Sequence, residues 1–205
     1  MLLLCVLWSC GSSSGTPSTP GPLVDNTKWM PSEEGEEFFG APPADSVCLP
    51  EPIDCPEYPW RDGECVDLAG STCIVSFVPE CFGAFTVLAV YTRMANPQLP
   101  LCNWLTLEQP SLRAIQAGDQ VEVRTRHAAL TAPATDPATR ARMSFVIGDQ
   151  IAFDYNTLIP SASKFSTNVW TASKDYPAGT PFLFHVENHG SNEYMLIEVN
   201  ILDPH

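Results

Sequence analysis

The chain has 205 residues, a formal net charge of −14 and no basic patch, which excludes binding to a polyanionic nucleic acid. The acidic residues are concentrated early in the chain. Residues 25–67 hold 12 acids against two bases, whereas residues 68–205 hold 12 acids against eight. An acidic extension of this kind is typical of a soluble segment that holds a domain away from a surface.

The N-terminus begins with a short apolar run, residues 2–8, that ends two residues before a cysteine. The run is too short to span a bilayer and has the length of a secretory leader's apolar core. The motif Leu7-Trp8-Ser9-Cys10 resembles the lipobox of bacterial lipoproteins. The resemblance implies that residues 1–9 are a signal peptide and that Cys10 carries a lipid that anchors the protein to a membrane of the cell envelope. Gly11 stands where enteric inner-membrane lipoproteins carry Asp, which implies an outer-membrane location.

The region after the cysteine, residues 10–47, is rich in Gly, Ser, Thr, Pro and acidic residues. This composition predicts a flexible acidic tether with little apolar matter to bury. Four large apolar side chains interrupt it and are candidates for docking on the folded part: Trp29, Met30, Phe38 and Phe39.

Residues 48–81 are rich in cysteine and broken by prolines, so we expect a loop-rich segment ordered mainly by covalent bridges. An even number of cysteines in an exported chain predicts three disulfide bonds. None of the spacings is that of a zinc knuckle or ribbon. The pairing stays open among six residues: Cys48, Cys55, Cys65, Cys73, Cys81 and Cys102.

From residue 74 onward the apolar residues recur with a period of two, and residues 82–205 are predicted to form one all-β domain. Gly148-Asp149 is typical of a two-residue hairpin turn. The only stretch that favours a short helix is 135–143. Short strands with turn signals predict an antiparallel β-sandwich or jelly roll. The expected strands are 74–78, 85–91, 119–127, 143–147, 150–155, 182–188 and 194–201.

One segment combines two imidazoles and a carboxylate on a single predicted strand face. His185, Glu187 and His189 alternate with apolar residues, and His127 ends another strand. Together they suit a divalent transition metal such as zinc, iron, copper or manganese. The stretch resembles a cupin strand, in which a Pro-x-Gly turn leads to a metal-binding histidine. Cupins place that histidine about three residues after the glycine, and Phe182 occupies this position here. The alternative is a structural role on a solvent-facing strand and its following turn.

Aromatic residues offer a second kind of site, because exposed rings stack on sugars. Trp170, Asp175 and Tyr176 lie in a predicted loop region and are the candidates for ligand binding; the alternative is that the rings belong to the core.

No nucleophile motif or nucleotide-binding loop is present. The sequence therefore favours a non-enzymatic binding or structural module, displayed by a lipid anchor, with a glycan or a protein as ligand. A metal-binding, cupin-like protein is the alternative.

Overall fold

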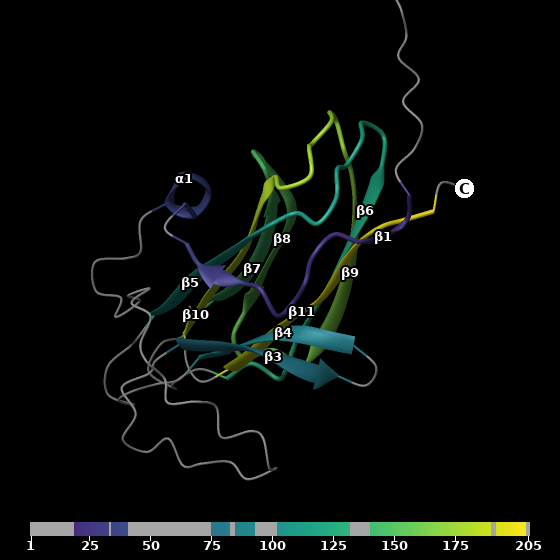
Figure 1. Ribbon diagram of the computed structural model, residues 1–205. Helices are drawn as coiled ribbons and strands as arrows, with labels where there is room; N and C mark the ends of the chain where they lie inside the picture. The colour runs from purple at the N-terminus through teal and green to yellow at the C-terminus, as the bar shows by residue number, and fades with distance from the viewer. Residues whose placement is uncertain are drawn as a thin grey trace, which may run out of the picture.

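The computed structural model describes residues 19–32, 34–40, 75–82, 85–92, 102–131, 140–189 and 192–203. These residues form two antiparallel sheets packed face to face, as Figure 1 shows, so the predicted antiparallel sandwich is confirmed. Sheet A has the order β3-β4-β11-β6-β9, with β1 beside β11, and sheet B has the order β2-β5-β10-β7-β8. Within the described part, no helix is long and apolar enough to cross a membrane.

The elements, in chain order, are β1 (Gly21–Pro22), β2 (Met30–Pro31), α1 (Glu36–Phe39), β3 (Val75–Phe82), β4 (Phe85–Thr92), β5 (Cys102–Pro110), β6 (Gln120–His127), β7 (Arg140–Ile147), β8 (Gln150–Leu158), β9 (Lys164–Thr171), β10 (Pro181–His189) and β11 (Asn192–Ile201).

The core lies between the two sheets, and the alternation of the strands determines which side chains enter it. In β6, Val121 and Val123 are fully buried; in β10, Phe182, Phe184 and Val186 are buried in the same core. The intervening residues of each strand therefore point away from the opposite sheet. In β10 this agrees with the sequence prediction, which placed His185 and Glu187 on the face opposite to the apolar residues.

The segment before α1 belongs to this core. Leu23 is fully buried and Trp29 is 4% exposed. The Trp29 indole meets the Phe145 ring edge-on at a centroid distance of 6.3 Å. The predicted tether, residues 10–47, is therefore wrong over the described residues 19–32 and 34–40, because Leu23, Val24 and Trp29 are packed in the sandwich core. Asn26 reinforces this attachment by donating to the carbonyl oxygens of Thr86 and Ile197, both at 2.9 Å.

The boundaries of several strands also differ from those predicted. The sandwich includes β3, which was expected to lie within the cysteine-rich segment, and β7 begins at Arg140, inside the stretch 135–143 that favoured a helix. The short β1 and β2 and the longer β5 and β9 were not predicted. β9 was not predicted because its exposed Phe165 and Val169 lie on the outer face, whereas the polar Ser166 and Asn168 face inward.

The turn between β7 and β8 has the predicted two residues, Gly148 and Asp149. Gly148 has φ = 56°, and no non-glycine residue described has a positive φ. A positive φ at the first central residue only is the signature of a type II′ turn. The turn thus holds β7 and β8 in register at one end of sheet B.

Replacing Gly148 by Ala is expected to destabilise the protein by about 1–2 kcal/mol, since an L-residue is strained at this φ. The added Cβ would also lie 3.0 Å from Tyr176 Cε1. Gly179→Ala is the matched control: its φ is 87°, but no heavy atom lies within 4 Å of the added Cβ. Urea unfolding of both variants separates backbone strain from the contact with Tyr176. Equal losses would show that the contact contributes nothing.

Candidate functional site

The outer face of sheet B is covered by the segment that contains α1, which Figure 1 shows on the side away from sheet A. Pairing of β2 with β5 brings the segment onto the sheet, and Ser32 N–H then donates to Thr106 O at 3.0 Å. Gly35 lies so close to Thr106 that an added Cβ would be 2.2 Å from Thr106 Oγ1. Only glycine permits this approach, which seats α1 on the sheet.

Beneath α1 the side chain of His185 is fully buried, although it points away from the sandwich core. The Phe39 ring stacks on the imidazole with a centroid distance of 4.0 Å and an interplanar angle of 11°. Thr106 Oγ1 lies 2.8 Å from His185 Nδ1, and Glu187 Oε1 lies 3.2 Å from Nε2. Because an ionised carboxylate can only accept, Nε2 carries the proton of the neutral ring and Nδ1 accepts from the Thr106 hydroxyl.

A guanidinium joins this histidine to a second carboxylate. Arg142 donates to Glu187 Oε1 at 3.1 Å, and it forms two hydrogen bonds to Asp154 at 2.7 and 3.2 Å. Ser144 also donates to Asp154, at 2.6 Å. The register explains the cluster, since His185 lies opposite Thr106 and Ser144, and Ser144 lies opposite Asp154. One polar row thus crosses four strands.

The charges of this cluster are arranged around one cation. Burial opposes ionisation of Asp154, but its hydrogen bonds from Arg142 and Ser144 outweigh this effect and lower the pKa. Burial likewise opposes ionisation of Glu187, and the donors His185 and Arg142 together lower its pKa. Burial lowers the pKa of His185, against the effect of Glu187. At neutral pH the cluster therefore holds two carboxylates, one guanidinium and a neutral imidazole.

The line of hydroxyl, imidazole and carboxylate formed by Thr106, His185 and Glu187 has the order of groups found in catalytic triads. Thr106, however, is 3% exposed and lies under Gly35. No substrate can reach its hydroxyl while α1 is seated. In this conformation the cluster positions α1 and does not present a nucleophile.

Replacing His185 by Gln is expected to flatten the fall in stability as pH decreases from about 7 to 5. The folded pKa lies below the ordinary value of 6.5, so the unfolded chain takes up the proton first. The contribution of the neutral, buried His185 to the free energy of unfolding is fully present above the unfolded pKa. It is lost as pH falls through 6.5 toward the folded pKa, at up to about 1.4 kcal/mol per pH unit. Burial also lowers the pKa of His127, so a variant lacking both imidazoles should be flatter still. Urea unfolding at several pH values measures the slope, and an unchanged slope in His185→Gln would contradict the assignment.

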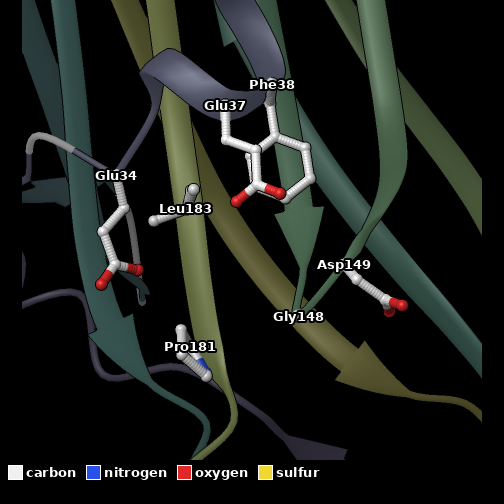
Figure 2. A pocket seen from close by; sticks show the side chains of 7 residues that line it. All are labelled: Glu34, Glu37, Phe38, Gly148, Asp149, Pro181 and Leu183. Carbon is white, nitrogen blue, oxygen red and sulfur yellow. The ribbon is translucent and has the colours of Figure 1, made fainter.

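A groove opens beside α1 on this face, with a volume of about 610 Å³. That volume falls within the range of about 300–1,000 Å³ that is usual for small-molecule sites. Figure 2 shows how three elements contribute its walls: α1 and the turn before it, the start of β10, and the β7–β8 turn. The lining residues are Glu34, Glu37, Phe38, Gly148, Asp149, Pro181 and Leu183.

The groove combines an apolar floor with carboxylates on its rim. Leu183 is buried at the base, whereas Glu34, Glu37 and Asp149 are exposed. Asp149 forms an ion pair with Lys174 at 2.7 Å, and the hydrogen bond from this ammonium lowers the pKa of Asp149. Such a lining offers hydrogen-bond acceptors and an aromatic side chain to a ligand, and it disfavours an anion.

Comparisons with known proteins leave the family open. No family model and no curated protein sequence matches the chain. The N-terminal cellulose-binding domain of β-1,4-glucanase C from Cellulomonas fimi aligns over 58% of this chain and 80% of its own length, with 14% identity and a TM-score of 0.39. TmCBM61 in complex with β-1,4-galactotriose aligns over 65% and 85%, with 6% identity and a TM-score of 0.39. The K1 cleaved adhesin domain of Lys-gingipain from Porphyromonas gingivalis W83 aligns over 65% and 92%, with 13% identity and a TM-score of 0.32. Values this low carry no conclusion about ligand or activity.

The residues predicted as metal ligands do not form one site. His127 points into the space between the sheets, where it stacks on Tyr155, whereas His185 lies on the outer face of sheet B. The sheet separates the two imidazoles, so they cannot share an ion. His189 lies opposite Cys102 in the β5–β10 ladder, and its side chain lies outside the described part. Across the residues that the structure describes, no group of three His, Cys, Asp or Glu side chains is arranged to hold a metal.

The three residues predicted to bind a ligand serve the fold in different ways. Tyr176 is 4% exposed and belongs to the core. Trp170 packs on it with a centroid distance of 5.8 Å and remains half-buried. Asp175 accepts from Ala117 N–H at 2.7 Å, which ties together the two loops at this end of the sandwich. Asp175 is exposed and Trp170 is half-buried, so both keep surface that a ligand can contact, whereas Tyr176 does not.

Proposed function

We propose that the protein is a non-enzymatic binding module held at the surface of the cell envelope by a lipid on Cys10. The described β-sandwich supports the module, and the groove beside α1 is the observation that supports binding. The lipobox-like motif supports the anchor, and the six further cysteines fit an oxidising compartment. Cys10 and the side chains of these six cysteines lie outside the described residues.

The groove favours a neutral polyhydroxylated ligand, which is the chemistry of a glycan. Carboxylates such as Glu34 and Glu37 accept hydrogen bonds from hydroxyl groups, and they repel phosphate or carboxylate ligands. The Phe38 ring and the Leu183 side chain supply apolar surface against which the C–H face of a sugar packs. Affinity would come from these contacts together, with the outer face of sheet B as a rigid base.

The test is a glycan array probed with the wild-type protein and with a Glu37→Gln, Phe38→Ala double variant. The variant should lose at least about tenfold in affinity for any bound glycan, equivalent to about 1.4 kcal/mol. Thr167→Ala, on the exposed outer face of β9, is the matched control and should bind like the wild type. Equal binding by the double variant would place the ligand elsewhere. Capture of cationic peptides in place of glycans would show that the carboxylates select charge.

The anchor has its own test, which does not depend on the ligand. Cells that express the wild-type chain should incorporate labelled palmitate into it, and the Cys10→Ala variant should incorporate none. The matched control is Cys5→Ala, which removes a cysteine within the predicted leader and should leave labelling intact. Labelling that persists in Cys10→Ala would overturn the anchor while leaving the groove proposal standing.

A further inference from the structure

The inner faces of β6 and β9 carry two buried hydroxyl groups that have no hydrogen-bond partner among the described residues. They are Thr125 Oγ1, in a side chain that is fully buried, and Ser166 Oγ. Thr125 lies directly opposite Ser166 in the β6–β9 ladder, so both hydroxyls project from neighbouring positions on the same side of sheet A. A buried hydroxyl left unpaired costs about 1–3 kcal/mol, so two adjacent ones point to a shared partner.

Two contacts between the sheets frame this position. On one side, Asn168 donates to Ala152 O at 2.7 Å and joins the edge strands β9 and β8. On the other side, the His127 imidazole stacks on Tyr155 with a centroid distance of 5.6 Å. The sheets are thus tied at both ends of a short stretch in which Thr125 and Ser166 place two polar side chains on the inner face of sheet A. The inner face of a sandwich is ordinarily apolar, and an exception of this kind needs an explanation.

His127 follows Thr125 by two residues on the same buried face of β6, so its imidazole lies on the same side of sheet A. His127 Nδ1 lies 2.7 Å from Ala128 O, which can only accept, so Nδ1 carries the proton of the neutral ring. Nε2 then carries a lone pair and can accept a hydrogen bond. The contact described for it is with the Tyr155 hydroxyl, at a long distance of 3.4 Å. The group that complements two hydroxyls and a neutral imidazole nitrogen is itself a hydroxyl, because it donates and accepts at once. A carboxylate, which can only accept, would match the two hydroxyls but not the imidazole nitrogen.

We infer that a small neutral hydroxyl-bearing molecule binds beside Thr125 and Ser166, on the inner side of β6 and β9, and bridges their hydroxyl groups. The hydroxyl can belong to water or to a small polyol, and the lining recognises the same chemistry in both. This site is separate from the groove beside α1, because it lies between the sheets and the groove lies on the outer face of sheet B. If this inference is wrong, the proposed function is unaffected.

The test uses the full chain and compares Thr125→Val, Ser166→Ala and the double variant in thermal unfolding. Thr125→Val keeps the shape of the side chain and removes the hydroxyl. If the guest is present, each single variant should lower Tm by about 2–4 °C, which corresponds to about 1 kcal/mol for a protein of this size. The double variant should lose less than the sum, since both changes remove the same guest. The control Thr167→Val, on the exposed face of β9, should stay near the wild-type Tm.

The outcomes separate the alternatives. If the two hydroxyls have no guest, Thr125→Val is neutral or raises Tm, because it removes an unpaired polar group, and the inference is overturned. Additive losses would also overturn it, because the hydroxyls would then act independently. Should Thr125→Val fail to fold, Thr125→Ser against Thr125→Ala makes the same comparison, with the hydroxyl kept in one variant and lost in the other.

A titration distinguishes the two sources of the hydroxyl. The wild-type Tm is measured against increasing concentrations of glycerol and of a monosaccharide, with Thr125→Val as the reference for general solvent effects. A wild-type rise in excess of the reference identifies a polyol, because a ligand that binds only the folded state raises its stability. Parallel responses, together with the non-additive losses, identify an internal water.

Discussion

Replacing Trp29 by Ala is expected to lower the free energy of unfolding by about 3–5 kcal/mol, the usual cost of removing a large buried aromatic side chain. Trp29 is 4% exposed and contacts both Phe145 and Phe184, with centroid distances of 6.3 and 6.4 Å. Its indole N–H also donates to Asn26 Oδ1 at 3.0 Å. The substitution would remove contacts to the centre of the core and one buried hydrogen bond.

The adjacent residue supplies the control for this prediction. Met30 is 63% exposed, so Met30→Ala should change the free energy of unfolding by no more than about 0.5 kcal/mol. Urea unfolding followed by tryptophan fluorescence and by circular dichroism measures both variants. If Trp29→Ala unfolds at the same urea concentration as Met30→Ala, the segment before α1 adds nothing to the core.

Replacing Asn188 by Ala is expected to cost about 3 kcal/mol, because this side chain bridges the two sheets with buried hydrogen bonds. Asn188 Nδ2 donates to Thr92 Oγ1 at 2.6 Å. Its Oδ1 accepts from Tyr194 OH at 2.6 Å and from Asn192 Nδ2 at 2.8 Å. Alanine would remove the shared partner of three polar groups, all of which are less than a tenth exposed.

Two controls separate the network from ordinary effects of substitution. Tyr194→Phe removes a single hydroxyl from the same network and should cost about 1 kcal/mol. Asn156→Ala removes an exposed amide on β8 and should stay within about 0.5 kcal/mol of the wild type. Urea midpoints of the three variants give the comparison. A loss in Asn188→Ala no larger than in Tyr194→Phe would mean that the remaining groups find other partners.

The fold class could be predicted because several strands have one face against the opposite sheet. The alternation of Val121 and Val123 in β6, and of Phe182 and Phe184 in β10, predicted which faces are buried. β9 could not be found in this way, because it is an edge strand in which Ser166 and Asn168 face inward while Phe165 and Val169 are exposed. The docking of Trp29 was also hidden, since a single aromatic residue in a polar segment has no period that indicates burial.

The candidate site was predicted only in part. Alternation placed His185 and Glu187 on one face, and the structure shows their side chains in contact. Arg142 and Asp154 join them through the register of β10 with β7 and of β7 with β8. Register is determined by hydrogen bonds between strands that are distant in sequence, so the period of one strand does not reveal it. The face of β10 that carries His185 was also predicted to face solvent, but α1 covers it. No sequence pattern predicted this contact.

The pairing of β1 with β11 changes how the proposed anchor would hold the domain. Gly21 lies opposite Ile201, so the sandwich has already begun by β1. Nine residue steps separate Cys10 from residue 19, where the described part begins, and a fully extended chain spans about 3.3–3.6 Å per residue. A lipid on Cys10 would therefore keep residue 19 within about 30 Å of the modified cysteine. The acidic, cysteine-rich stretch falls between α1 and β3, as an insertion in the domain, so a ligand would be captured close to the lipid headgroups.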